Sequence, residues 1–457
     1  MSIPHEIFRA YDIRGVVNET LNTEIVHAIG RALGTNMQML DCHIAAIGRD
    51  GRKSSPDFSK ALCSGLLSTG CDVIDVGVVP TPTLYHAASR ISDGTGFQIT
   101  GSHNPPQYNG IKMMINRETL AGEKIQNLRD LVLDKNFSVG QGQLSTMDIR
   151  SDYVNSIIND IQLKKPYKVV IDCGNGVAGS IAPDIFRRLG LEVIELYCEI
   201  DGDFPNHHPD PSIPENLKDL IHLVRNSSAD LGFAFDGDGD RLGVISPSGQ
   251  IIWPDRQMIL FSWSVLKQIP GAQIIYDVKC SQLLAKSIVK AGGKPIMWKT
   301  GHSFIKKKMK ECGAPLAGEM SGHIFFNDRW EGFDDGIYAA ARLCEILSKE
   351  DATPGQIFDA IPDTVNTPEI KIDLKEGESS KIVDALVHSV VFEDAEVSLI
   401  DGLRVDFEDG FGLVRASNTT PSLIMRFEST DHTTLHSIID RFQNELKKIR
   451  SDLGIPY

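Results

Sequence analysis

The chain has 457 residues, of which 41% are hydrophobic and 23% charged, and its formal net charge is −15. A single hydrophobic core stops growing near ~250–300 residues, so this length excludes a one-domain protein. The acidic balance argues against a nucleic-acid or anionic-membrane partner, although a local basic site can still bind a small anion.

The first residues, MSIPHEIFRAYDIRG, lack the basic and apolar regions of a secretory signal. No apolar run approaches the ~18 residues that a membrane-spanning helix needs. The eight cysteines are scattered without a C-x-x-C pair, which is typical of free thiols in a reducing cytoplasm, with a zinc site as the alternative. We therefore expect a cytoplasmic protein that has no membrane partner.

The chain repeats one pattern of elements three times. An apolar stretch runs into a polar loop at residues 43–55, 167–180 and 272–284. A helix-like stretch follows each loop and ends at a glycine, as helix C-caps do: Gly70, Gly190 and Gly292-Gly293. A second strand then follows, in CDVIDVGVV, LEVIELYCEI and KPIMWKT. Strand, helix and strand at this spacing form a crossover unit, which predicts parallel pairing in an α/β layer.

Each repeat then adds a short strand, a polar loop and a return strand: FQI-TGSHNPPQYNG-IKMMI, LGFAF-DGDGDR-LGVI and PLA-GEMSG-HIFF. Ligands of open α/β sheets gather at the carboxyl ends of strands, so we expect these three loops to meet at a shared centre. In the rest of the chain, apolar and polar residues alternate as they do in strands, and helix-like stretches follow. This pattern predicts a smaller α+β domain.

The predicted fold class is therefore α/β, with three similar units of mixed sheet and a C-terminal α+β domain around a central cleft. The last boundary falls where Pro362 and Pro368 interrupt regular structure. The predicted domains are 1–147, 148–250, 251–362 and 363–457.

The earliest polar loop, FRAYDIRG (8–15), contains Tyr11 and Arg14. Either residue is a candidate for an anion site that is completed by other loops. The alternative for Arg14 is an ordinary surface charge.

The segment TGSHNPPQYNGIK (100–112) places Ser102 after a strand and outside any G-x-S-x-G turn, which argues against a hydrolase. Gly101 allows backbone N–H groups to approach an anion, and Lys112 adds a positive charge across the loop. This set suits a serine that carries a phosphoryl group, with about −1.5 to −2 charges. His103 is adjacent, but neighbouring side chains rarely meet. The alternative is a serine that only caps a turn.

The stretch GNGVAG (174–179) matches the dinucleotide fingerprint, and Glu195 follows at the distance of a ribose-binding acid. A dinucleotide-dependent oxidoreductase is therefore a rival. The matching loops of the other two repeats do not share this motif, which argues against that reading.

The loop DGDGDR (236–241) places three carboxylates at alternate positions: Asp236, Asp238 and Asp240. Such a set can gather on one hard cation, and Mg²⁺ completed by a phosphate oxygen suits it best. An EF-hand is excluded because Arg241 and Pro247 stand where the required glycine and glutamate should be. The alternative is a solvated acidic turn.

In the third repeat, Lys279 follows the first strand and His302 follows the second, in KTGHS. The loop GEMSGH (318–323) offers Glu319 and Ser321, whose carboxylate and hydroxyl suit neighbouring sugar hydroxyls, with His323 close by. The alternative is an ordinary polar turn.

The last loop, RASNTT (415–420), combines the guanidinium of Arg415 with the side chains of Ser417, Asn418, Thr419 and Thr420. These groups in one turn predict a phosphate cradle, with a polar hairpin as the alternative.

Taken together, these segments resemble the α-D-phosphohexomutases, and most closely their bacterial phosphomannomutase/phosphoglucomutase branch. The pair TGSHNP and DGDGDR carries the resemblance, which runs from FRAYDIRG to RASNTTPSL. Phosphoglucosamine mutases have a similar sugar loop with a different residue at the place of Met320.

This resemblance implies a four-domain enzyme in which Ser102 carries phosphate and the three aspartates hold Mg²⁺ with an oxygen of that phosphate. It places Arg14, Lys112 and Arg241 beside the phosphoserine, with His103. It further implies that these residues bind substrate: Tyr11, Lys279, His302, Glu319, Met320, Ser321, Gly322, His323, Arg415, Ser417, Asn418 and Thr419.

The implied reaction is reversible phosphoryl transfer between C1 and C6 of mannose and glucose phosphates, with a hexose 1,6-bisphosphate as intermediate and activator. Lys112 and His103 are both candidates for the proton acceptor. We expect small hexose phosphates as partners and a monomer or weak oligomer. The open alternatives are a phosphoglucosamine mutase, the oxidoreductase and a non-catalytic sugar-phosphate binder.

Overall fold

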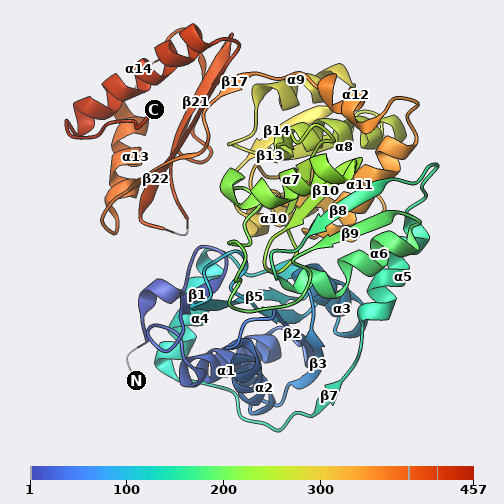
Figure 1. The fold of residues 1–457 in the computed structure, drawn as a ribbon. Helices are drawn as coiled ribbons and strands as arrows, with labels where there is room; N and C mark the ends of the chain where they lie inside the picture. Colours follow the sequence, from blue (N-terminus) through green and yellow to red (C-terminus); the bar gives the residue numbers. More distant parts are fainter. Residues whose placement is uncertain (1–2, 390–391, 419) are drawn as a thin grey trace.

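The computed structural model describes residues 3–389, 392–418 and 420–457. Over these ranges the chain forms four β-sheets, each with its own helices, which follow one another from blue to red in Figure 1. The predicted architecture of three mixed α/β units and one α+β unit is confirmed. The boundaries at residues 147, 250 and 362 stay predictions.

The first sheet has the strand order β1-β5-β4-β2-β3-β7, and β6 pairs with β5. Strand β2 is parallel to β3 and β4, whereas β5 returns antiparallel to β4. Ser102 therefore lies at the carboxyl end of β4, in the loop that leads to β5. The elements are β1 (Ile13–Val16), α1 (Thr23–Met39), β2 (Ile44–Arg49), α2 (Ser55–Leu67), β3 (Asp72–Val78), α3 (Thr81–Ile91), β4 (Gly96–Ile99), β5 (Tyr108–Ile115), β6 (Glu118–Thr119), α4 (Glu123–Asp134) and β7 (Leu144–Thr146).

The second sheet has the order β12-β11-β10-β8-β9, with β8 parallel to both β9 and β10 and with β11 antiparallel to β10. Strand β10 is buried at every position, as expected for a continuous apolar run inside a layered sheet. The acidic loop 236–241 joins β10 to β11. The elements are α5 (Arg150–Asp160), β8 (Lys168–Asp172), α6 (Ala182–Arg188), β9 (Glu192–Leu196), α7 (Lys218–Ser227), β10 (Leu231–Phe235), β11 (Leu242–Ile245) and β12 (Ile251–Ile252).

The third sheet repeats this plan in the order β14-β13-β15-β16, with parallel pairs on either side of β13 and an antiparallel return strand, β16. The loop that contains Glu319 joins β15 to β16. The elements are α8 (Pro254–Gln268), β13 (Gln273–Asp277), α9 (Gln282–Lys290), β14 (Lys294–Trp298), α10 (His302–Cys312), β15 (Leu316–Gly318), β16 (Ile324–Phe326), α11 (Gly336–Ser348) and α12 (Pro354–Asp359).

The last sheet is antiparallel, in the order β17-β22-β21-β20-β19 with β18 also paired to β22. Helices α13 and α14 pack on β21, on the face away from the rest of the chain (Figure 1). The elements are β17 (Val365–Asn366), β18 (Ile370–Asp373), α13 (Glu378–Ser389), β19 (Glu396–Ser398), β20 (Leu403–Phe407), β21 (Gly410–Ala416), β22 (Ser422–Ser429) and α14 (His432–Ile449).

The second and third units share one hydrophobic core, which runs from Tyr153 to Ile361, whereas the first and last units have their own. Helix α11 packs against both units, because it contacts β11 of the second and β16 of the third. Protein cores are close-packed, so the shared core fixes the loops after β10 and β15 relative to each other.

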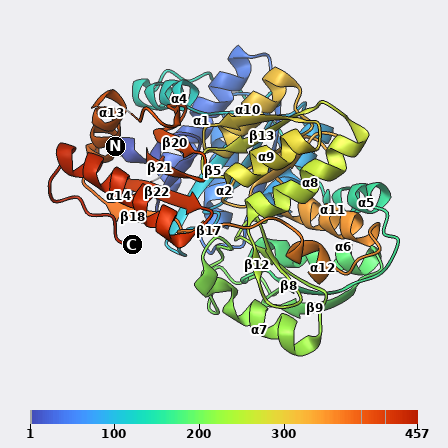
Figure 2. The ribbon, with the colours of Figure 1, turned by 90° about the horizontal axis from the view of Figure 1, so that it is seen from above.

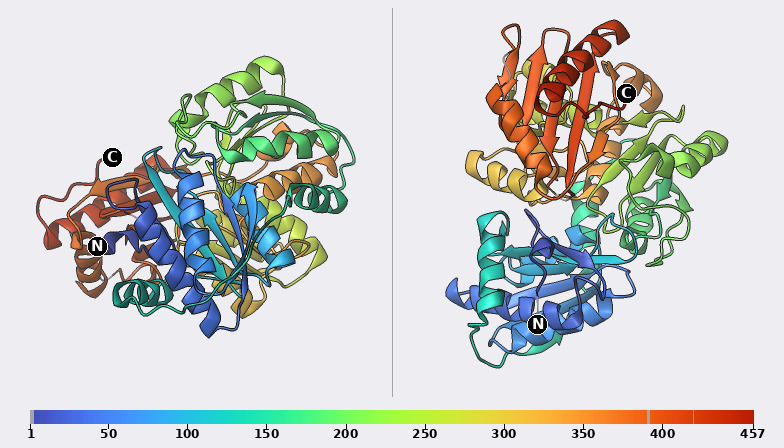
Figure 3. Two further views of the ribbon diagram at one scale, coloured as in Figure 1. Left: turned by 90° about the horizontal axis from the view of Figure 1, so that it is seen from below. Right: turned by 90° about the vertical axis from the view of Figure 1, so that its left-hand side faces the viewer.

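The last unit lies apart from the second, as the view from above shows: α13 and α14 are on one side, and α7, β8 and β9 on the other (Figure 2). The side view places the last unit over the first (Figure 3, right). Among the helices of the described residues, none combines the length and the apolar character that crossing a bilayer would need.

Candidate active site

Loops from all four sheets line one cleft of about 510 Å³. Of the residues predicted from the sequence, it is lined by Tyr11, Arg14, Ser102, His103, Lys112, Arg241, Lys279, His302, Glu319, Met320, Ser321, His323, Arg415, Ser417 and Asn418. The three aspartates of 236–240 and Gly322 lie behind this lining, and Thr419 lies outside the described residues. A larger cleft of about 870 Å³, lined by Arg90, Arg117 and Lys310 among others, contains none of the predicted site residues.

The hydroxyl of Ser102 forms part of this cleft. Its Oγ donates to Oδ2 of Asp236 over 3.0 Å, although 134 positions separate the two residues. Ser102 is 2% exposed and has a left-handed φ of 49°, a conformation that costs a non-glycine residue about 1–3 kcal/mol. A side chain at Gly237 would collide with the carbonyl oxygen of Ser102, so the loops of the first two sheets are in backbone contact.

His103 also meets this hydroxyl, with Nδ1 at 3.1 Å from Oγ of Ser102. Adjacent side chains rarely face each other, yet these two meet, at a residue with a left-handed φ. Burial, reinforced by the charges of Arg241 and Arg14, lowers the pKa of His103 well below its ordinary value. The imidazole is therefore neutral at pH 7, and one of its ring nitrogens carries a free lone pair.

The acidic loop is held in a tight bend by its own backbone. Oδ1 of Asp236 accepts the N–H groups of Gly239, Asp240 and Arg241 at 3.1, 3.1 and 3.2 Å. Thr81 donates from Oγ1 to Oδ2 of Asp238 at 2.5 Å, which ties the loop to helix α3.

The three aspartates form a group that can hold a metal ion, since one oxygen of each lies within 4.8 Å of the others. Oδ1 of Asp238 and Oδ1 of Asp240 are buried, and neither has a hydrogen-bond partner among the described residues. Buried carboxylate oxygens without donors are costly, so the site fits a bound divalent cation.

Lys112, on β5, neutralises the other oxygens of the same loop. Its Nζ lies 2.7 Å from Oδ2 of Asp238 and also donates to Oδ2 of Asp240. Burial opposes the ammonium charge, but the carboxylates of Asp238 and Asp240 together raise the pKa of Lys112 well above its ordinary value. Lys112 is therefore a fixed positive charge in this state.

Arg14 is oriented by two neighbours, with Nη2 donating to Oδ2 of Asp12 and Nη1 to Oδ1 of Asn104. Asn104 belongs to the Ser102 loop, so Arg14 is fixed beside that loop.

Arg241 donates from Nε to Nε2 of His323 at 3.1 Å. This contact places the imidazole proton of a neutral His323 on Nδ1.

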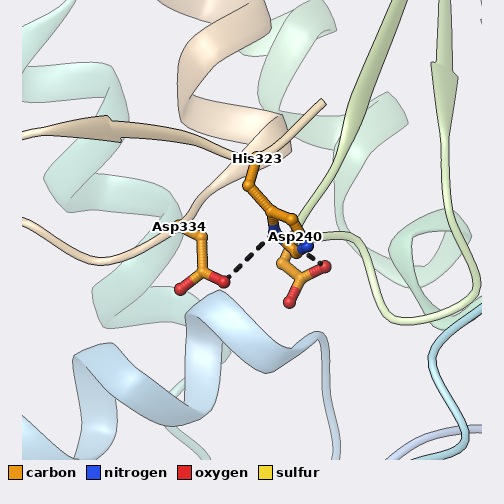
Figure 4. A group of neighbouring side chains, drawn as sticks. All are labelled: Asp240, His323 and Asp334. Carbon is orange, nitrogen blue, oxygen red and sulfur yellow. Dashed lines mark ion pairs between the residues drawn. The ribbon is translucent and has the colours of Figure 1, made fainter. Parts of the chain in front are cut away.

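His323 lies between two carboxylates that come from different elements (Figure 4). Its Nδ1 is 3.2 Å from Oδ2 of Asp334 and 3.6 Å from Oδ1 of Asp240. Oδ1 of Asp334 lies 2.8 Å from Nζ of Lys306, and its Oδ2 lies 3.5 Å from Nδ1 of His302. Asp334 thus connects the two histidines of the cleft.

Glu319 is almost fully buried and accepts the N–H of Gly301. Burial raises its pKa to about 7. The N–H of the next residue, Met320, donates to Oδ1 of Asp277 over 3.0 Å, and Gly322 has a φ of 99° that suits its glycine. The loop 318–323 is therefore fixed mainly through its backbone, which leaves the side chain of Ser321 at the cleft.

At the far end of the cleft, two cations face carboxylates. Nζ of Lys279 lies 3.0 Å from Oε2 of Glu369, and Nε of Arg415 lies 3.0 Å from Oδ2 of Asp401. Asn418 donates from Nδ2 to the carbonyl oxygen of Thr300 at 3.2 Å, which connects the last loop to the third unit.

Several residues that contact the site were not found from the sequence. They are Asp50, Arg52, Thr81, Asp277, Asp334, Glu369 and Asp401. Asp50 and Arg52 stand in a polar loop after a strand, the same signal that indicated the other loops. Asp334 follows an aromatic residue in GFDDG, where no pattern points to a site.

The dinucleotide-like stretch 174–179 has a structural role. The N–H of Val177 donates to the carbonyl oxygen of Gly237 at 3.1 Å, and a side chain at Gly176 would come within 2.9 Å of the same residue. Glu195 pairs with Arg187 at the surface. The glycines of this stretch thus pack against the acidic loop, which fills the space in front of them.

Comparisons with known proteins agree along the whole chain. Models of the phosphoglucomutase/phosphomannomutase family match in order: alpha/beta/alpha domain I at residues 5–137, domain II at 151–249, domain III at 253–365 and the C-terminal domain at 369–445. The phosphomannomutase/phosphoglucomutase of Pseudomonas aeruginosa is 52% identical over 456 residues, covering 100% of this chain and 98% of its own. The phosphoglucomutase of Neisseria gonorrhoeae is 50% identical, covering 97% of each chain.

A crystal structure of a phosphoglucomutase/phosphomannomutase family protein from Burkholderia thailandensis matches with a TM-score of 0.95, at 49% identity and with 100% of both chains covered. With four domain models in sequence and half of all residues shared with full-length relatives, this chain belongs to the phosphoglucomutase/phosphomannomutase family of α-D-phosphohexomutases.

Proposed function

We propose that this enzyme moves a phosphoryl group reversibly between C1 and C6 of mannose and glucose phosphates, with Ser102 as the carrier. The chain is a hexose phosphate mutase, and therefore an isomerase, as its full-length curated relatives are named. One observation supports Ser102 most directly: its buried hydroxyl lies 3.0 Å from an aspartate of a second sheet, at the floor of a cleft with several cations.

In the proposed reaction, the bond from phosphorus to Oγ of Ser102 breaks while a bond to a sugar hydroxyl oxygen forms. The hexose 1,6-bisphosphate then turns end for end, and its other phosphoryl group returns to Ser102. Such transfers depend on position and charge neutralisation more than on covalent chemistry. Lys112, Arg14 and Arg241 are the side chains placed to supply positive charge.

Asp236, Asp238 and Asp240 would hold the cation, which we propose to be Mg²⁺. Their oxygens fit a hard cation, and Lys112 already balances part of their charge. When bound, Mg²⁺ supplies two positive charges next to the phosphoryl oxygens.

The attacking sugar hydroxyl must lose a proton, and we assign that proton to an imidazole of the cleft. Lys112 holds its own proton tightly, because two carboxylates raise its pKa, so it is a poor acceptor. His103 is neutral and meets Oγ of Ser102, so it is the imidazole that we assign. Nε2 of His323 already accepts from Arg241 and its Nδ1 faces Asp334, so His323 has no free nitrogen for this role.

Substrate recognition must work in both orientations of the sugar. Glu319 and Ser321 suit hydroxyls that lie alike in both, the 3- and 4-hydroxyls, so a site that ignores C2 would accept both glucose and mannose. Arg415, Ser417, Asn418 and Thr419 would bind the phosphate that is not reacting, with Lys279 beside them. Tyr11, His302, Met320 and Gly322 would contact the sugar.

Intact mass and peptide mapping of the purified protein test the carrier. We expect an additional ~80 Da, the mass of one phosphoryl group, on the TGSHNP peptide after incubation with a hexose 1,6-bisphosphate. Phosphate on another residue would refute the assignment.

Turnover of mannose 1-phosphate against glucosamine 1-phosphate then separates the two sugar specificities. We also propose a cytoplasmic protein that acts as a monomer or weak oligomer.

A further inference from the structure

The loop that carries Ser102 is wrapped around one buried guanidinium, that of Arg52. This side chain is 1% exposed and lies in the polar loop after β2, fifty positions before Ser102. It donates to four backbone carbonyl oxygens of the Ser102 loop: Ser102 at 2.7 Å, Asn104 at 2.6 Å, Pro105 at 2.7 Å and Tyr108 at 3.1 Å.

The fifth donor of Arg52, Nε, is taken by Oδ2 of Asp50 at 3.1 Å. A guanidinium has five N–H donors in a fixed planar fork, so each of them is used here. Asp50 balances the buried charge and is itself held, because it accepts the N–H of Arg52 and Oγ of Ser55. It also accepts the N–H of Gly101 at 3.1 Å, which ties it directly to the residue before Ser102.

The space around this guanidinium is closed from both sides. A side chain at Gly101 would collide with the guanidinium, which accounts for the glycine before Ser102. The ring of Phe204, from the second unit, lies 4.9 Å from the guanidinium carbon. Asn104 connects this arrangement to the cleft, because its carbonyl oxygen accepts from Arg52 while its side chain accepts from Arg14.

We propose that Arg52, held by Asp50, is a positioning residue that sets the shape of loop 101–108 and so the place of Oγ of Ser102. This inference rests on the proposed role of Ser102 as phosphoryl carrier. Arg52 itself contacts no reacting atom in this scheme. It acts by fixing four carbonyl oxygens at once, which holds Ser102 in its left-handed conformation against Asp236.

Lysine at this position provides the sharpest test, because Arg52→Lys keeps the charge but replaces a planar fork by one rotating ammonium. Three donors on one nitrogen cannot reach four carbonyl oxygens and a carboxylate. We expect kcat to fall roughly 100-fold, as for a displacement of about 1 Å at the reacting group, with KM within about threefold of wild type.

Arg342→Lys is the matched control, since Arg342 is likewise buried, at 3% exposed, and paired with a carboxylate, that of Asp328. Among the described residues, its hydrogen bonds reach none that lines the cleft. Arg342→Lys should lower Tm about as much as Arg52→Lys does, and it should leave kcat within a fewfold of wild type. If Arg52→Lys loses no more turnover than Arg342→Lys, the proposal is overturned.

A second measurement is made by hydrogen exchange and does not depend on how well Arg52→Lys folds. In the wild-type protein, amides of the peptide 100–110 should exchange slowly, because Arg52 holds four carbonyl oxygens of this loop. In Asp50→Asn, which keeps the size of the side chain, exchange should rise in 100–110 and not in the strands of the last sheet. Unchanged exchange in 100–110 would contradict the proposal.

Ser102→Ala separates this inference from the function on which it rests. If Ser102→Ala keeps full turnover, the carrier assignment fails and Arg52 has nothing to position. If Ser102→Ala is inactive and Arg52→Lys is fully active, the carrier stands and the positioning role is refuted.

Discussion

Nζ of Lys279 lies 3.0 Å from Oε2 of Glu369, which stands at the start of the last unit. The charge of Lys279 lowers the pKa of Glu369, so the carboxylate is ionised at neutral pH. A cation proposed to bind the substrate's phosphate is therefore occupied by an internal anion, which an incoming phosphate must displace.

Removing that anion should strengthen substrate binding. Glu369→Gln is expected to lower KM for hexose phosphates roughly twofold to fivefold, since a partly exposed ion pair contributes up to ~1 kcal/mol. Steady-state kinetics with glucose 1-phosphate measures this, and Glu376→Gln provides a surface control of equal charge change. An increase in KM would show that Glu369 contributes to the site instead of competing with it.

Arg415→Ala should raise KM by at least tenfold and change kcat much less, because a contact with the non-reacting phosphate is equal in the ground state and the transition state. Removal of the guanidinium also leaves Asp401 without its partner, so Asp401→Asn in the same background isolates that effect. A large loss in kcat at unchanged KM would place Arg415 at the reacting phosphate.

Ser102→Ala should lose at least ~100-fold in turnover, since a covalent carrier supplies several kcal/mol of the barrier reduction. Ser321→Ala is the matched control: it removes one hydroxyl from the same cleft and should mainly raise KM. Activity of Ser102→Ala equal to that of the control would exclude the phosphoserine mechanism.

Lys112→Gln should make the protein depend on metal for stability. Without the ammonium, the buried carboxylates of Asp238 and Asp240 are left without their ion-pair partner, which lowers Tm by several degrees in the presence of a chelator. Millimolar Mg²⁺ should raise the Tm of this variant by more than it raises the Tm of the wild-type protein. Lys279→Gln, whose ion pair lies away from the aspartates, should show no such recovery, and an equal Mg²⁺ effect in both variants would contradict the assignment.

Glu319 gives a prediction about pH. Its pKa is about 7 in the folded protein, against 4.5 for an ordinary glutamate. Between these values the folded state keeps a proton that the unfolded state has lost, so this group's contribution to stability falls as pH rises. Since each pH unit corresponds to about 1.4 kcal/mol, Glu319→Gln should gain a few degrees in Tm relative to wild type between pH 5 and pH 7.5. Glu311→Gln, an exposed change on α10, should show a constant difference.

The sequence predicted the three repeated units because each strand, crossover helix and return strand is specified by local patterns. Strands β10 and β11 begin and end where the apolar runs LGFAF and LGVI do. Glycines that end helices, such as Gly70 with a φ of 88°, marked the same places. The shared core from Tyr153 to Ile361 was not predicted, because periodicity shows which face of an element is apolar but not what covers it.

In the candidate site too, local sequence patterns predicted some features and not others. The loops around Ser102, Asp236 and Glu319 could be named because unusual residues gather between apolar strands. Their partners could not, since Arg52 and Asp401 are common residue types that become meaningful only when distant segments meet. The contact of Ser102 with His103 accompanies a left-handed φ at Ser102, which no sequence pattern predicts.

The backbone contact between Gly237 and Ser102 limits how such an enzyme can vary. The loop 236–241 has no room for one more carbon atom at Gly237, so a substitution there would require the Ser102 loop to move at the same time. Libraries of random variants should therefore retain many substitutions along the sugar-facing rim and almost none at Gly237, which makes the rim the place where new substrate preferences can arise.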